Sequence, residues 1–193
     1  MKGCMAANSL PVTILPALRE LQIMLQQFWA DDIPVDGIPL AFWTIRNDAL
    51  LFDALQYFPC CIYLKGGPSG EGHSAADLAL LPKGFQLVAS IFRLEEEFSF
   101  NGWTAIHNLG GDLLSHVIEA YFTVGLPRRA EALRRVLDAY VATPDDEEGE
   151  PYRIAAQGEL PDLMDDEDGC ATVLAYLRSE PATLFGALPH PGT

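Results

Sequence analysis

Apolar residues recur at steps of three and four along most of this chain, the spacing of one face of an α-helix. In the first half they predict helices over residues 16–29 and 40–58 and a short helix over 74–80. In the second half they predict helices from Pro82 to Phe100, Leu113 to Thr123, Pro127 to Tyr140 and Ala171 to Ser179. No apolar–polar alternation is long enough to build a sheet, although residues 60–64 stay open as a short strand or a buried connection. The predicted fold class is all-α.

Residues at the helix ends support these boundaries. Pro82 and Pro127 suit a first helical turn, where the missing N–H of proline costs nothing. Gly125 suits a helix C-terminus, and Asp112 is a good N-cap for the helix that starts at Leu113. The whole chain is expected to form one domain over 1–193. Its parts are N-terminal helices with a glycine-rich loop over 1–80, a helical region over 80–186 and an acidic segment over 144–169.

Composition narrows the class of protein. The chain has 193 residues, of which 49% are hydrophobic and 20% charged, so a disordered acidic chain is excluded. The longest apolar runs fall well short of the ~20 residues that span a bilayer. None of the four cysteines forms a C-x-x-C pair, so neither a disulfide framework nor a zinc site is supported. A cytoplasmic protein without membrane partners is expected.

The formal net charge of −15 is unevenly distributed. Residues 1–143 carry a net −5, and residues 144–193 carry a net −10 with only two bases, Arg153 and Arg178. A protein that binds nucleic acid directly through its own surface carries the opposite charge. The partner expected for this segment is therefore a basic protein.

The excess acids form two groups. The first acidic block consists of Asp145, Asp146, Glu147, Glu148 and Glu150, and the second acidic block of Asp162, Asp165, Asp166, Glu167 and Asp168. Two interpretations stay open: a partner-binding surface, or solvated charge that keeps the protein soluble. The second block stands before a helix, whose dipole favours acids there, and is therefore the better candidate. The first block, followed by Pro151, has the composition of a loop.

Candidate catalytic and metal-binding groups are sparse. Glu95, Glu96 and Glu97 are consecutive and point in different directions on a helix, so we expect one to bond back to the loop at Asn101 and the others to face water. A hydrolase would need a pocket that joins them to His107 or His116. His116 shares a helical face with either Glu119 or Asp112, and each pair offers two metal ligands, with no third evident in the sequence. We expect no catalytic residue, metal or cofactor, and thus no enzyme.

The stretch Arg93 to Trp103, RLEEEFSFNGW, begins a family resemblance. Residues 80–186 resemble the bacterial, all-helical DNA-mimic-protein (DMP-type) domain. The matching features are a glutamate before an Asn-Gly pair, a later Asn and Gly, two helices and a C-terminal pattern: Glu96 or Glu97, Asn101, Gly102, Asn108, Gly111, Val117 to Gly125, Ala130 to Ala139, Leu160, Asp162, Tyr176, Pro181 and Phe185. The chain departs from the pattern at Trp103, where the family has a second glycine. We expect the Asn-Gly element to be a structural loop that ends a helix.

The resemblance implies a homodimer whose acidic surface occupies the DNA-binding site of a transcription factor. The physical logic is that duplex DNA carries one negative charge per ~1.7 Å of axis, which arginines and lysines meet. Carboxylates on successive helical turns stand roughly 5–6 Å apart, so a rigid acidic face suits the same basic groove. The alternative is a toxin-neutralising immunity protein or other interaction module, in which the acids cover a basic active-site cleft.

Overall fold

The computed structural model describes residues 47–49, 51, 52, 55, 56, 82–160, 163 and 166–185. The helices predicted over 16–29 and 74–80 and the segment 60–64 lie outside this part. Within it every regular element is helical and no residue is in a strand, so the all-α prediction is confirmed. The labelled helices are α4 (Lys83–Asn101), α5 (Thr104–Val124), α6 (Pro127–Ala142), α7 (Glu150–Ala156), α8 (Glu167–Ser179) and α9 (Pro181–Phe185).

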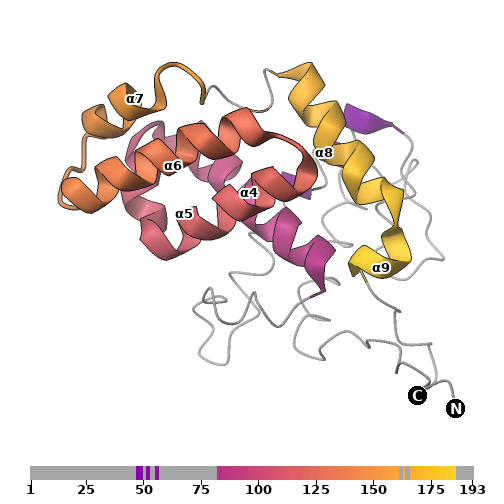
Figure 1. Ribbon diagram of the computed structural model, residues 1–193. Helices are drawn as coiled ribbons and strands as arrows, with labels where there is room; N and C mark the ends of the chain where they lie inside the picture. Colours follow the sequence, from indigo (N-terminus) through magenta and orange to yellow (C-terminus); the bar gives the residue numbers. More distant parts are fainter. Residues whose placement is uncertain are drawn as a thin grey trace, which may run out of the picture.

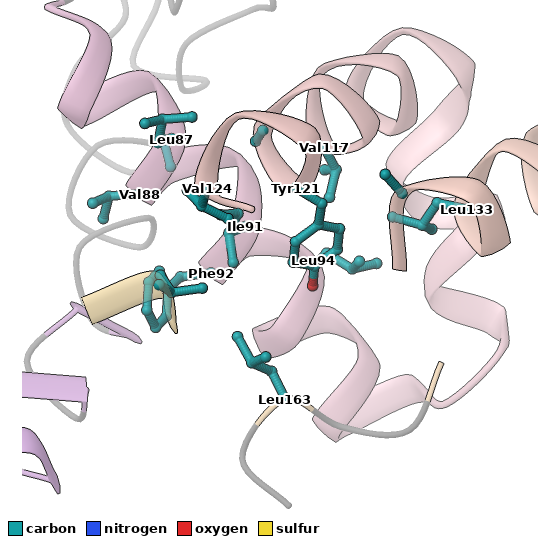
Figure 2. Close-up of a cluster of buried hydrophobic side chains, with 14 of the residues drawn as sticks. Leu87, Val88, Ile91, Phe92, Leu94, Val117, Tyr121, Val124, Leu133 and Leu163 are labelled. Atoms are coloured by element: carbon teal, nitrogen blue, oxygen red, sulfur yellow. The ribbon is translucent and has the colours of Figure 1, made fainter. Parts of the chain in front are cut away.

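Helices α4, α5 and α6 form the centre of the described structure (Figure 1). Helix α7 packs on α6, and α9 packs on α4. The predicted apolar faces meet in one core, which includes Phe85, Val88, Ile91, Phe92, Val117, Tyr121, Leu133, Val136, Val173 and Leu177. Figure 2 shows Tyr121 and Leu163 among the aliphatic side chains of this core. No helix of the described residues is both long and apolar enough to cross a bilayer.

The described residues between 48 and 56 are helical, in keeping with the helix predicted over 40–58. Phe52 packs edge-on against Phe92 of α4, with ring centroids 5.0 Å apart. Arg178 of α8 forms an ion pair with Asp48. These contacts attach the N-terminal residues to the same core as the C-terminal helices.

The predicted starts of two helices are wrong. Helix α5 begins at Thr104, nine residues before Leu113, and is interrupted at Gly110, whose φ of 72° and ψ of 166° break the helical path. Asp112 therefore lies inside the helix and does not cap it. Buried Ala105 and Ile106 hold the first part of α5 in the core.

Helix α8 begins at Glu167, not at Ala171 as predicted, because the side chain of Asp166 caps it. Helix α7 was not predicted at all. Pro151 stands in its first turn, a position where proline is favoured, and Tyr152 and Ala156 pack into the core. Of the residues expected in a loop, Glu150 therefore belongs to this short helix.

Candidate functional site

The first acidic block begins in the connection between α6 and α7, and its backbone is held by several hydrogen bonds. The hydroxyl of buried Tyr152 contacts the carbonyl oxygens of Thr143, at 2.9 Å, and Asp146, at 3.1 Å. Thr104 Oγ1 donates to the carbonyl of Glu147 at 3.0 Å. The N–H of Gly149 donates to Asp146 Oδ1 at 2.7 Å. The segment is a loop, as predicted, but a bonded one with defined positions.

Trp103 packs against the end of this loop. Its ring packs edge-on against Phe98 at a centroid distance of 4.9 Å, and its backbone and Cβ lie against Gly149. His107 Nδ1 lies 3.1 Å from the carbonyl oxygen of Pro144, at the start of the same loop. Trp103, the residue that departs from the family pattern, therefore helps to hold the acidic loop.

The carboxylates of the first block differ in their partners. Asp145, Glu147 and Glu148 are exposed, and within the described residues they form no ion pair. Glu150 pairs with Arg153 at 2.6 Å, and the hydrogen bond from that arginine lowers the pKa of Glu150. The three exposed carboxylates of the loop therefore offer their charge to solvent or to a cation.

The second acidic block is held differently. Asp162 and Asp165 lie outside the described residues. Asp166 caps α8 by accepting the Gly169 N–H at 2.9 Å, and it pairs with Arg129 at 3.1 Å. These bonds, first that from Gly169 and then that from Arg129, lower the pKa of Asp166. Glu167 and Asp168 are exposed in the first turn of α8, where the helix dipole favours acids.

Behind Asp166 lies a buried polar network. Glu95 of α4 is 4% exposed, and its carboxylate accepts the Tyr121 hydroxyl at 2.5 Å and the Leu163 N–H at 2.7 Å. Arg129, 6% exposed, joins the network on the side of Asp166. Burial, and next the charge of Glu95, raise the pKa of Tyr121 well above its usual value. The expectation that Glu95 faces water is therefore wrong, because it lies on the buried face of α4.

The two acidic blocks stand at opposite ends of α6. The first is bonded to Thr143, just after the helix, and the second to Arg129 in its first turn. The rise of an α-helix places these two positions about 21 Å apart. Figure 1 shows α7 and α8 at the two ends of α6. Helix α6 therefore acts as a spacer between the two blocks.

A cleft of about 350 Å³ lies beside the second block, lined by Gly125, Leu126, Pro127, Arg128, Arg129, Gly158, Glu159 and Asp166. Its charges are matched in pairs: Arg128 with Glu159 at 2.6 Å, and Arg129 with Asp166 at 3.1 Å. Two arginines thus weaken the negative field at this end of α6. Among the described residues no arginine pairs with Asp145, Glu147 or Glu148, so their field is not weakened in this way.

The Asn-Gly element closes α4, as predicted. Gly102 has a φ of 53° and its N–H bonds to the Phe98 carbonyl. Glu97 makes the bond back to the loop, accepting from Asn101 Nδ2 at 2.8 Å and from Asn108 Nδ2 at 3.4 Å. Glu96 forms an ion pair with Arg93 at 3.0 Å, because residues three apart lie on the same side of a helix.

The glutamates and histidines considered for catalysis or metal binding make separate contacts. His116 Nδ1 lies 2.8 Å from the carbonyl oxygen of Asp112, and His107 contacts Pro144. Glu95 is committed to Tyr121 and Leu163. Within the described residues no three His, Cys, Asp or Glu side chains come together as metal ligands would.

The residues that hold the acidic blocks were missed by the sequence reasoning, although a signal existed for one of them. Glu95 continues the series Phe85, Val88 and Phe92 at helical spacing, which places it on the buried face of α4. A charged residue on such a face needs a buried partner. No local pattern marks Tyr121 or Leu163 as the partners of Glu95.

Comparison with known families identifies the family of this chain. The family model of the DMP19-like proteins matches residues 79–180, which is more than half of the chain and contains the whole stretch from α4 to α8. The chain belongs to the DMP19-like family. The resemblance inferred from the Asn-Gly element and the helices that follow it is confirmed. Neither the curated proteins nor the solved structures give this DMP19-like chain a match.

Proposed function

We propose that this DMP19-like chain is a non-enzymatic, cytoplasmic regulator that binds a basic DNA-binding protein through its two acidic blocks, in the manner of a DNA mimic. The observation that carries the proposal is the bonded geometry of the first block. Mimicry requires carboxylates at fixed positions, because phosphates on duplex DNA are regularly spaced. The bonds of Tyr152 and Thr104 to the loop supply that rigidity to Asp145, Glu147 and Glu148.

The electrostatic arrangement supports a basic partner. The three loop carboxylates have no arginine partner among the described residues, so a cation that approaches them has no internal pair to displace. The second block, about 21 Å away along α6, adds the exposed Glu167 and Asp168. A basic groove that meets both blocks must span this distance. The homodimer that the resemblance implies belongs to the same proposal, and analytical ultracentrifugation measures it.

The test starts with capture of the partner from source-cell lysate on the immobilised chain, followed by elution with a salt gradient. The captured protein is then bound to fluorescent duplex DNA, and the chain is added as competitor. We expect displacement of the DNA, with an apparent affinity that falls as salt rises. A triple substitution, Asp145→Asn with Glu147→Gln and Glu148→Gln, should weaken competition about 10–100-fold, from about 0.5–1 kcal/mol for each lost charge.

A matched control removes the same charge elsewhere. Asp112 and Glu119 are exposed on α5, Glu180 is exposed at the end of α8, and all three lie outside both blocks. Their triple change to Asn, Gln and Gln should leave competition within about threefold, because exposed charges away from α6 and the two blocks are screened by salt. Equal losses in the two triple variants would show that only total charge matters. If the captured protein is instead an enzyme that the chain inhibits without displacing DNA, the immunity alternative replaces the DNA-mimic proposal.

A further inference from the structure

The buried carboxylate of Glu95 connects α4 to α5 and to the segment that precedes α8. It lies on the inner face of α4, and one of its oxygens accepts the hydroxyl of Tyr121 from α5. The other accepts the backbone N–H of Leu163, which is 68 residues away in the sequence. Leu163 stands three residues before the N-cap of α8, so this bond attaches the approach to the second acidic block to the helical core.

A second connection between the buried network and the second acidic block is made by Arg129. Arg129, in the first turn of α6, is buried and pairs with Asp166 at 3.1 Å. The charges of Glu95 and Asp166 both favour the ionised guanidinium of Arg129. Asp166 in turn accepts the Gly169 N–H, and Gly169 is packed so closely that a Cβ there would lie 2.6 Å from Asp166 Oδ2. The start of α8 is therefore tied to α4, α5 and α6 through two buried charges.

We propose that Glu95 is the positioning residue of the second acidic block: through the Leu163 N–H and through Arg129 it sets where Asp166, Glu167 and Asp168 stand relative to the first block. The consequence for partner binding rests on the proposed function, while the positioning itself does not. A partner that contacts both ends of α6 needs this distance to be constant. Glu95 supplies that constancy from inside the core, with no contact to the partner.

Hydrogen exchange on the free, full-length protein tests the positioning. In the wild type, the Leu163 amide should be protected to a degree comparable with core amides such as that of Val117. Exchange of Leu163 as fast as that of the exposed Glu148 amide would overturn the proposal without any variant. In Glu95→Gln the side chain keeps its shape but has one acceptor oxygen and no charge to face Arg129. Exchange at Leu163 and Gly169 should rise at least tenfold.

Tyr121→Phe is the matched control. It removes the hydroxyl that donates to Glu95 but leaves the carboxylate with Leu163 and Arg129, so exchange at Leu163 and Gly169 should stay within about threefold of the rate expected from its overall stability. If Glu95→Gln accelerates Val117 and Leu163 equally, the residue is only a general stabiliser and the proposal is wrong.

The functional consequence is read in the DNA-competition assay. Glu95→Gln leaves every exposed carboxylate in place, so the slope of affinity against salt should remain that of the wild type while the affinity itself falls about fivefold or more. An unchanged affinity, together with faster exchange at Leu163, would show that the second block takes no part in binding. If the wild type displaces no DNA, the proposed function fails, and the exchange result still decides the positioning.

Discussion

Gly149 lies so close to Trp103 that no side chain fits between them. A Cβ at Gly149 would stand 2.6 Å from both the Cβ and the carbonyl carbon of Trp103. The backbone of Gly149 also has a φ of 77°, in the left-handed region. Trp103 in turn packs against Phe98 of α4. The acidic loop before Gly149 is therefore supported by a stack that begins in the helical core.

This contact predicts a large cost for Gly149→Ala. The left-handed backbone costs a side chain about 1–2 kcal/mol, and the collision with Trp103 adds about 1–3 kcal/mol. We expect the free energy of unfolding to fall by about 2–5 kcal/mol in urea titrations followed by tryptophan fluorescence. Gly158→Ala is the control, because Gly158 has the same φ of 77° and no heavy atom within 4 Å of its Cβ position. It should cost only about 1–2 kcal/mol; equal losses would show that backbone strain alone matters.

Most of the described helices follow from local sequence. Phe85, Val88 and Phe92 lie on the buried face of α4, and Gly125 ends α5 in the left-handed conformation that its composition predicts. Helix α7 does not follow, because its seven residues carry too little apolar surface to specify a helix alone. Its stability comes from α6: Arg135 donates to the carbonyl oxygens of Ala155 and Ala156, which satisfies the end of α7.

The second prediction concerns the hydroxyl of Tyr152. Phenylalanine fills the same space but removes the donor that contacts Thr143 and Asp146. Tyr152→Phe should lower the free energy of unfolding by about 1–2 kcal/mol. It should also weaken DNA competition, because it loosens the first acidic block without changing its charge.

Tyr140→Phe serves as its control. The Tyr140 ring packs beside that of Tyr152, with centroids 6.1 Å apart, and within the described residues its hydroxyl forms no hydrogen bond. This change should alter stability by less than about 0.5 kcal/mol and leave competition unchanged. Competition that is unaffected in Tyr152→Phe would contradict the link between loop rigidity and binding.

The positions of the acidic residues follow from the sequence, but the way they are held does not. Asp166 precedes a helix, and aspartate is one of the residues preferred at the N-cap, which is the role it has in α8. Its second partner, Arg129, comes from 37 residues earlier, and the partners of Glu95 come from 26 and 68 residues later. Such contacts depend on how three helices pack, which no single local pattern encodes.

The third prediction is a change in acid sensitivity at Asp166. Its pKa is lowered in the folded protein, so its contribution to stability is present above the ordinary aspartate pKa of about 4 and is lost as pH falls through the folded value. Asp166→Asn keeps a capping oxygen but cannot titrate. At neutral pH it should lower the free energy of unfolding by about 1 kcal/mol through the weakened pair with Arg129.

The difference between wild type and Asp166→Asn should then shrink as pH is lowered from about 6 to about 3. Urea unfolding at a series of pH values measures it. Asp168→Asn, an exposed change in the first turn of the same helix, controls for the loss of one acid near the helix dipole. A constant difference across the acid range in Asp166→Asn would mean that the titration of this carboxylate is not coupled to folding.

The fourth prediction concerns alkaline stability and Tyr121. Its pKa is raised well above that of an exposed tyrosine, first by burial and then by the charge of Glu95. A raised folded pKa means that the stabilising effect is complete below about pH 10, where the unfolded tyrosine is neutral, and is lost as pH rises through the folded value. By about pH 11 this one group should have removed about 1.4 kcal/mol of stability from the wild type, relative to neutral pH.

Tyr121→Phe lacks this titration. At neutral pH it should be less stable than the wild type by about 1.5–3 kcal/mol, because the hydrogen bond to the carboxylate of Glu95 is lost. Above about pH 10 the gap should narrow, since only the wild type then loses the contribution of this residue. Urea unfolding from about pH 8 to about pH 11 follows the gap, and both proteins keep the other five tyrosines, so the comparison isolates Tyr121. If the stabilities of the two proteins instead fall in parallel with pH, the ionisation of Tyr121 is not coupled to folding. That result would contradict a buried, neutral Tyr121 hydroxyl bonded to Glu95.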